Sequence, residues 1–193
     1  MVGRGGRLDV LYQGNGLTNR RKLTLGHAYS YFTSSRDRGR SWSAPLKVGA
    51  QAGTMATGDW WIDGDIAIDT GGTLYASWDT QGEDNRGHPH DIGWLSFSPN
   101  GGRTWSVPVQ APSDRSHTPH IIEVAGGPAG RAYVGWLSTS DRRGWALYLR
   151  TFSTARGWLD QPVRISRKFG RPLVWPGDTF GISILSPQRL VLS

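Results

Sequence analysis

The chain is 193 residues long, contains 27 Gly, 11 Pro and 10 Trp but no Cys, and carries a formal net charge of +7. The lack of Cys excludes disulfides and thiolate metal sites, the N-terminus shows no signal peptide, and no run reaches the roughly 20 apolar residues that span a bilayer, so no membrane partner is expected. Because helices favour Glu and Lys, a chain with 2 Glu and 3 Lys favours short strands joined by turns.

The first elements in chain order are two strands and a basic run between them. The alternating segment RLDVLYQG predicts a strand, and HAYSYFTSS predicts a second one. The run NRRK at 19–22 is the tightest group of basic residues, whereas nucleic-acid binding requires them gathered on one face. We therefore expect scattered surface arginines and no nucleic-acid partner, with an anionic partner as the alternative.

A polar turn that ends in Trp then recurs along the chain. SRDRGRSW ends at Trp42, SPNGGRTW at Trp105 and the shorter STARGW at Trp158, and each follows an alternating strand and precedes a short strand with Pro. Paired strands upstream repeat as well. A period of 50 to 60 residues with four short strands is typical of a β-propeller blade. The sequence predicts an all-β propeller of four-stranded antiparallel blades, with blade parts at approximately 7–48, 64–111, 119–166 and 177–193.

The octapeptides resemble the Asp-box of the sialidase-like BNR repeat family, S-x-D-x-G-x-[ST]-W, with Asn in place of Asp in the second copy. The resemblance implies a six-bladed propeller of a secreted, glycan-directed type, related to glycoside hydrolases or carbohydrate-binding proteins. It also implies that the boxes lie on the face opposite the active site. The matching residues are Ser35, Asp37, Gly39, Ser41 and Trp42 in the first box, and Ser98, Asn100, Gly102, Thr104 and Trp105 in the second.

The Asp-box is predicted to be a structural turn. Asp37 or Asn100 can accept hydrogen bonds from backbone N–H groups of its own turn. Trp42 and Trp105 are then expected to fold back between sheets and bury roughly 200 Å² each. Chemistry is expected instead in the loops of the opposite face, at residues 13–27, 47–64, 79–91, 111–120, 138–144 and 167–178.

Two clusters in these loops suggest ligands. Trp60, Trp61 and Asp63 would suit a sugar, with a ring for stacking and a carboxylate for hydroxyl groups; alternatively one Trp packs under the loop and the acid caps a turn. Four histidines have spacings that permit a metal site, although exposed or hydrogen-bonded His is the commoner use. They are His88, His90, His117 and His120.

Acids that open inner strands are the candidates for catalysis. Asp65 is the second residue of GDIAID, and Asp178 is the second residue of GDTFG, a G-D-[YT]-x-G element that also resembles the BNR repeat proteins. Either carboxyl could act as an acid or a base. The alternative is that each accepts hydrogen bonds from the backbone of a neighbouring blade.

The resemblance also allows a test for sialidase chemistry, which uses a Tyr nucleophile with a Glu, an Asp acid/base and three Arg on the substrate carboxylate. The chain offers Glu83 and Glu123, places five Tyr in predicted strands and Tyr12 at a strand end, and lacks the Arg-Ile-Pro motif. No motif selects a triad from the loop arginines Arg20, Arg115, Arg143 and Arg171. We therefore expect an incomplete catalytic site and no cofactor.

About three and a third blades fit into 193 residues, whereas closed propellers have four to eight. Either the chain is a truncated propeller or two copies form a homodimer that completes the ring. The sequence thus favours a glycan-directed propeller segment without turnover, and the alternative is a non-catalytic scaffold for protein interactions.

Overall fold

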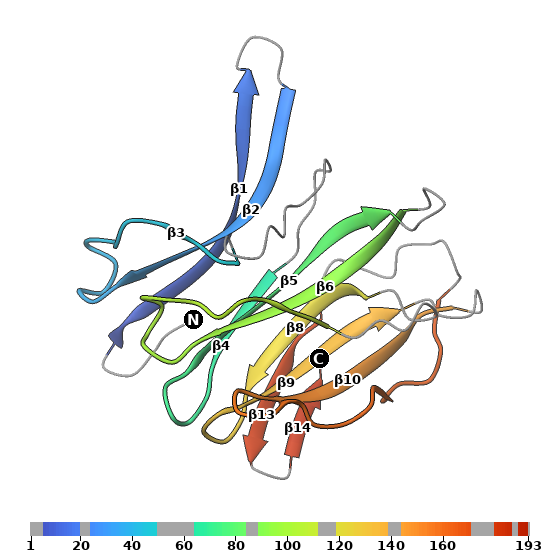
Figure 1. Ribbon diagram of the computed structural model, residues 1–193. Helices are drawn as coiled ribbons and strands as arrows, with labels where there is room; N and C mark the ends of the chain where they lie inside the picture. The colour runs from blue at the N-terminus through green and yellow to red at the C-terminus, as the bar shows by residue number, and fades with distance from the viewer. Residues whose placement is uncertain are drawn as a thin grey trace.

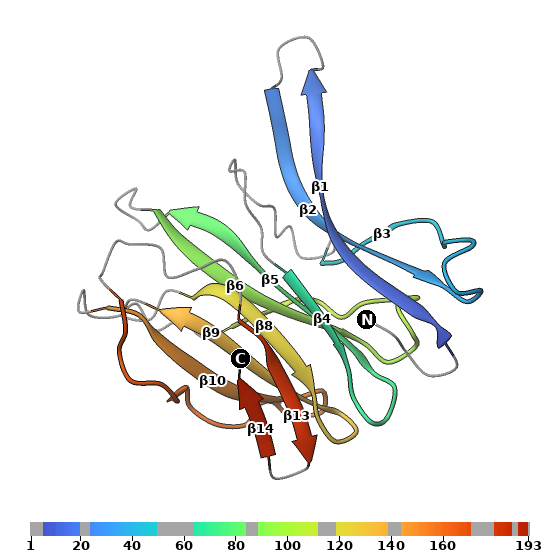
Figure 2. The ribbon, with the colours of Figure 1, turned by 180° about the vertical axis from the view of Figure 1, so that it is seen from behind.

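The computed structural model describes residues 6–19, 24–49, 64–83, 89–111, 119–138, 144–170, 180–186 and 189–192. Within these ranges every strand lies in an antiparallel sheet and no residue is in an α-helix, which confirms the predicted all-β class. No helix in the described part of the chain is long and apolar enough to cross a membrane. The strands form four sheets that follow one another in chain order (Figures 1 and 2).

The first and second sheets are meanders of consecutive strands. The first sheet consists of β1 (Leu8–Asn19), β2 (Thr24–Ser35) and β3 (Leu46–Lys47). The second sheet consists of β4 (Gly64–Ile68), β5 (Leu74–Glu83), β6 (Pro89–Ser98) and β7 (Val109–Gln110).

The third and fourth sheets complete the described part. The third consists of β8 (His120–Gly126), β9 (Arg131–Ser138), β10 (Ala146–Ser153), β11 (Gly157–Trp158) and β12 (Val163–Arg164), with both β11 and β12 paired to β10. The fourth is the pair β13 (Ile182–Ser186) and β14 (Arg189–Leu192).

Two hairpins are longer than the sequence predicted. Most of 13–27 was expected to be a loop, but β1 and β2 stay paired as far as Asn19 and Thr24. Likewise 79–91 was expected to be a loop, but β5 and β6 stay paired as far as Glu83 and Pro89. Pairing satisfies backbone N–H and C=O groups whatever the side chains are, so polar residues do not end a hairpin. The β1–β2 hairpin stands out beyond the other sheets (Figure 1).

The core lies between successive sheets, because alternate residues of each strand face opposite neighbours. On β5, Leu74, Ala76 and Trp78 pack toward Phe32 and Val48 of the first sheet. The intervening Tyr75 is buried with side chains of the third sheet, among them Val134, Trp136 and Phe152. Leu137, Trp145 and Leu147 on the opposite face of the third sheet pack with Phe180, beside the fourth sheet.

Equivalent glycines in the two Asp-boxes give a matched test of this packing. Gly39 and Gly102 have φ angles of +86° and +84°, so Ala is strained to a similar degree at both. A Cβ on Gly102 would overlap the Phe32 ring of the first sheet, whereas a Cβ on Gly39 would lie 3.4 Å from Leu8 Cδ1. We expect Gly102→Ala to lower the urea midpoint of unfolding much more than Gly39→Ala. Equal shifts would contradict the packing of the second box on the first sheet.

Candidate functional site

The first Asp-box turn is closed by its own side chains. Asp37 Oδ1 accepts hydrogen bonds from Ser41 N (2.9 Å) and Ser35 Oγ (2.7 Å), and Asp37 Oδ2 accepts one from Ser41 Oγ (2.5 Å). Ser35 Oγ in turn accepts a hydrogen bond from Gly39 N at 2.7 Å. The Ser41 hydroxyl, the Ser41 backbone N–H and the Ser35 hydroxyl together lower the pKa of Asp37 to about 2.

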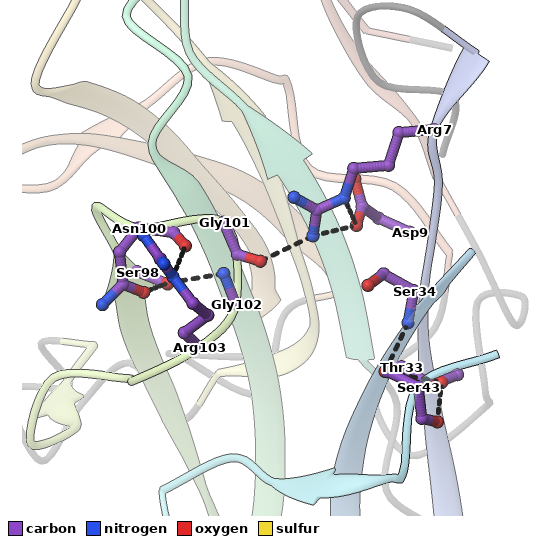
Figure 3. Close-up of polar contacts among 10 residues, drawn as sticks. All are labelled: Arg7, Asp9, Thr33, Ser34, Ser43, Ser98, Asn100, Gly101, Gly102 and Arg103. Atoms are coloured by element: carbon purple, nitrogen blue, oxygen red, sulfur yellow. Dashed lines mark hydrogen bonds and ion pairs between the residues drawn. The ribbon is translucent and has the colours of Figure 1, made fainter. Parts of the chain in front are cut away.

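The second turn joins the equivalent residues without a charge, and Figure 3 shows the hydrogen bonds that Ser98 makes with Asn100 and Gly102. Asn100 Oδ1 accepts from Thr104 N (3.0 Å) and Ser98 Oγ (2.9 Å), and Asn100 Nδ2 donates to Thr104 Oγ1 (2.7 Å). Ser98 Oγ accepts from Gly102 N at 2.8 Å. An Asx side chain therefore closes this turn in its charged form in the first box and in its neutral form in the second.

A serine directly after each Trp closes the turn from the other side, which the sequence did not predict. Ser43 Oγ accepts from Ser34 N (3.1 Å), and Ser106 Oγ accepts from Phe97 N (3.1 Å). The sequence does contain a signal for this contact, because a Ser directly follows the Trp in both boxes.

The difference in charge between the boxes predicts a difference in pH dependence. The pKa of Asp37 is about 2 in the folded chain, below the ordinary 3.8, so the stability from its ionised form is present above pH 4 and is lost as the pH falls toward 2. We expect the urea midpoints of wild type and Asp37→Asn to converge over that range. Asn100→Asp is the matched control, because it should add the same pH dependence to the second box. Parallel pH profiles for wild type and Asp37→Asn would contradict this.

The two box tryptophans differ in burial, and the prediction was wrong for Trp42. Trp105 is 8% exposed and lies edge-on to Phe32 of the first sheet, with ring centroids 5.4 Å apart. Trp158 also reaches the preceding sheet, because its Nε1 donates to Gln110 O at 3.1 Å. Trp42 is 45% exposed. In the described part of the chain no sheet precedes the first one, so nothing occupies the position that Phe32 has beside Trp105.

A pocket of about 590 Å³ lies between the first two box turns. Ser34, Arg36 and Trp42 line it from the first turn, and Gly101 and Arg103 from the second. Its lining includes two arginines, Arg36 and Arg103, beside the exposed Trp42.

An arginine on the first sheet fixes the second box turn from the side (Figure 3). Arg7 Nη2 donates to Gly101 O at 2.6 Å, and the same guanidinium pairs with Asp9 Oδ1 at 2.7 Å. Burial raises the pKa of Asp9, against the attraction of Arg7. This contact ties two sheets together and uses the charge of both side chains.

Asp65, a candidate for catalysis, accepts two backbone hydrogen bonds. Its Oδ1 accepts from Ile66 N (2.7 Å) and its Oδ2 accepts from Val124 N (3.1 Å) on β8 of the next sheet. These are the hydrogen bonds of the structural alternative that the sequence left open.

Asp69, in the turn before β5, was not among the predicted site residues. It accepts four hydrogen bonds, whereas Asp65 accepts two. Its Oδ1 accepts from the N–H groups of Gly71 (2.8 Å) and Thr73 (2.9 Å), and its Oδ2 accepts from Tyr75 Oη (3.0 Å) and Gly130 N (2.7 Å). Burial and the hydrogen bond to Asp69 both raise the pKa of Tyr75. A buried phenol held in its protonated form does not serve as a nucleophile.

The remaining predicted site residues are not placed by the structure. Three lie at strand positions, but their side chains are not described: Glu83, His90 and His120. The others lie outside the described residues: Trp60, Trp61, Asp63, His88, Arg115, His117, Arg143, Arg171 and Asp178. Within the described residues no group of three or more His, Asp or Glu is arranged to hold a metal ion.

Comparison with known proteins gives a likeness in fold. No family model matches the chain, and no curated protein does. A solved structure that matches is the crystal structure of a protein of unknown function from Dyadobacter fermentans DSM 18053, with 12% sequence identity and a TM-score of 0.56. The match covers 100% of this chain and 46% of the other, so the chain spans just under half the length of that structure. The two share an arrangement of β-sheets.

Proposed function

We propose that the chain is an arc of a sialidase-like Asp-box β-propeller in which each sheet is one blade. The observation that carries this proposal is the repeated turn: two octapeptides 63 residues apart close with the same Ser, Asx and Gly hydrogen bonds. The order of strands in the second sheet, β4-β5-β6-β7, is that of a four-stranded blade. The contact of Trp105 with Phe32 and the hydrogen bond from Trp158 to Gln110 each join a Trp to the preceding sheet, which supports a repeated packing of successive sheets.

The proposed activity is glycan binding without turnover. Asp65 and Asp69 accept backbone hydrogen bonds, and Tyr75 is buried and protonated, so these side chains are occupied in structure. The predicted sugar contacts are Trp60 and Trp61, which come between β3 and β4 in the chain and lie outside the described residues, so they stay a prediction.

A glycan array and a fluorogenic sialoside test this proposal together. We expect the purified protein to bind on the array and to release no fluorophore. The double variant Trp60→Ala, Trp61→Ala should lose the array signal, while Trp42→Ala, a matched loss of an indole on the Asp-box side, should keep it. Silence of the wild type on the array contradicts glycan binding, and release of the fluorophore contradicts the lack of turnover.

The second candidate function is a scaffold for protein contacts, favoured by the distribution of exposed apolar side chains. Of the eight large exposed hydrophobic residues in the described part of the chain, three lie in 8–49 and four in 144–170. The middle of the chain contributes one, Val107. A scaffold predicts that the glycan array stays silent. It also predicts saturable binding of a protein partner through exposed residues of the first or the third sheet.

A further inference from the structure

The turns at one end of the first three sheets form a continuous row. In each of these sheets the Ser that opens the Asp-box turn pairs with a residue at the start of β1, β5 or β9, so the box turn lies beside that start. Arg7 Nη2 donates to Gly101 O between the first and second sheets. Thr70 N donates to Gly127 O at 3.0 Å between the second and third. We call this row of turns the Asp-box end, and it consists of 36–42, 69–73, 99–104, 127–131 and 154–157.

Most of the exposed arginines in the described part of the chain lie in the Asp-box end. Eight arginines are exposed there in all, and two of them, Arg164 and Arg167, lie on or just after β12. The other six belong to the Asp-box end and are Arg36, Arg38, Arg40, Arg103, Arg131 and Arg156. Arginines that are scattered along the sequence are therefore gathered on one face by the fold.

The acids of the Asp-box end do not neutralise these arginines. Both carboxylate oxygens of Asp37 accept hydrogen bonds within its own turn. Asp69 is 4% exposed and accepts four hydrogen bonds. Among the described residues Asp160 is the one exposed acid, and it already pairs with Arg150 at 3.9 Å. The face thus keeps a surplus of positive charge, which attracts anions.

A concave part of this face lies between the first two box turns. The pocket of about 590 Å³ has Arg36 and Arg103 in its lining, and none of its lining residues is acidic. Arg103 Nε donates to Asn100 O at 3.1 Å, which holds that guanidinium group at the turn. Guanidinium groups bind oxyanions through paired N–H groups. The pocket can therefore seat one oxyanion group of a longer ligand.

We propose that the Asp-box end binds a sulfated polysaccharide along this row of turns. Such a polymer carries regularly spaced oxyanions, and the exposed arginines lie on turns of three successive sheets. Single-stranded nucleic acids fit less well, because their binding sites stack bases on a series of aromatic side chains. Trp42 is the one large exposed aromatic residue of the Asp-box end. The proposal does not depend on the predicted sugar contacts Trp60 and Trp61.

The test is the affinity for heparin, measured by isothermal titration calorimetry as a function of salt concentration. We expect log Kd of the wild type to rise linearly with log salt, because binding releases counterions. Two double variants, Arg36→Gln with Arg103→Gln and Arg131→Gln with Arg156→Gln, should each lower that slope by about 1.4 to 1.8, or about 0.7 to 0.9 for each arginine. Between about 50 and 200 mM salt the wild type then loses about tenfold more affinity than either variant.

The two exposed arginines outside the Asp-box end give a matched control. Arg164 is opposite Tyr148, five residues along β10 from Ser153, which places it about 16 Å from the box turn. Arg164→Gln with Arg167→Gln removes the same charge as each test pair and should leave the slope unchanged. An equal fall of the slope in this control, or an unchanged slope in either test pair, overturns a site along the turns. Because all of these side chains are exposed, unchanged circular dichroism and urea midpoints are expected.

A second probe decides the kind of anion. Heparin should bind more tightly than a single-stranded oligothymidylate with the same number of charges at the same salt concentration. Tighter binding of the oligonucleotide overturns the assignment to a polysaccharide, and so does a wild type that heparin fails to retain at low salt. The double variant Trp60→Ala, Trp61→Ala should keep its heparin affinity, so this proposal and the proposed glycan site of the loops can fail separately.

Discussion

Trp105→Ala is expected to lower the free energy of unfolding by about 4 kcal/mol, as large buried aromatic residues do. Trp42→Ala should cost only about 0.5 kcal/mol, as surface changes do. Both residues end an Asp-box, but Trp105 is 8% exposed and packs against Phe32, whereas Trp42 is 45% exposed. The same substitution at equivalent positions therefore separates the contribution of the motif from that of the neighbouring sheet.

Urea unfolding of dilute protein, followed by circular dichroism, measures both changes. Phe32→Ala is the reciprocal control, because removing the ring that Trp105 contacts should cost about 3 kcal/mol or more. Equal losses at the two tryptophans would mean that the box stabilises itself without the preceding sheet.

Asp69→Ala is expected to lower the free energy of unfolding by about 4 kcal/mol. The change leaves four donors without their acceptor, one of them Gly130 N–H on the neighbouring sheet. Tyr75→Phe removes only the hydrogen bond from the phenol and should cost about 1 kcal/mol. The contrast tests whether Asp69 acts mainly on the backbone of two turns.

Chemical denaturation measures the free energy of unfolding of both variants. A third variant, Asp69→Asn, tests how much the second carboxylate oxygen contributes. An amide has one carbonyl oxygen in place of two carboxylate oxygens, so Asn should fall between Asp and Ala. If Asp69→Ala lowers the free energy of unfolding by no more than Tyr75→Phe does, the backbone N–H groups form hydrogen bonds with water in the variant. Hydrogen exchange at Gly130 N–H reads the contact between sheets directly and should accelerate in Asp69→Ala.

The sequence predicted contacts between residues that are close along the chain better than contacts between different sheets. The acceptor role of Asp37 and Asn100 follows from a few neighbouring residues, and the hydrogen bonds lie within each turn. The burial of the Trp does not follow in that way, because it requires a ring from a strand of another sheet. That ring is present for Trp105 and absent for Trp42 among the described residues, although the two octapeptides read alike.

Polar residues were the other source of error. The segments after Tyr12 and after Trp78 are polar and rich in Gly, which predicted loops, yet both continue as paired strands. Tyr12 accordingly lies within β1 and not at its end. Asp69 was missed because an acid before two glycines is ordinary in a turn, and its bond to Gly130 joins residues 61 positions apart.

Tyr12 pairs with Tyr31 as Trp78 pairs with Trp94, and Trp42 ends the first Asp-box as Trp105 ends the second. This repetition has a consequence for how such a chain can evolve. A sheet whose front fits the back of its own copy can be duplicated within a gene without any new interface having to arise. Each added unit meets a surface already shaped for it, so the number of units can change in one recombination event. Changing what a unit binds, by contrast, requires separate substitutions in its loops, and the two properties can therefore be selected independently.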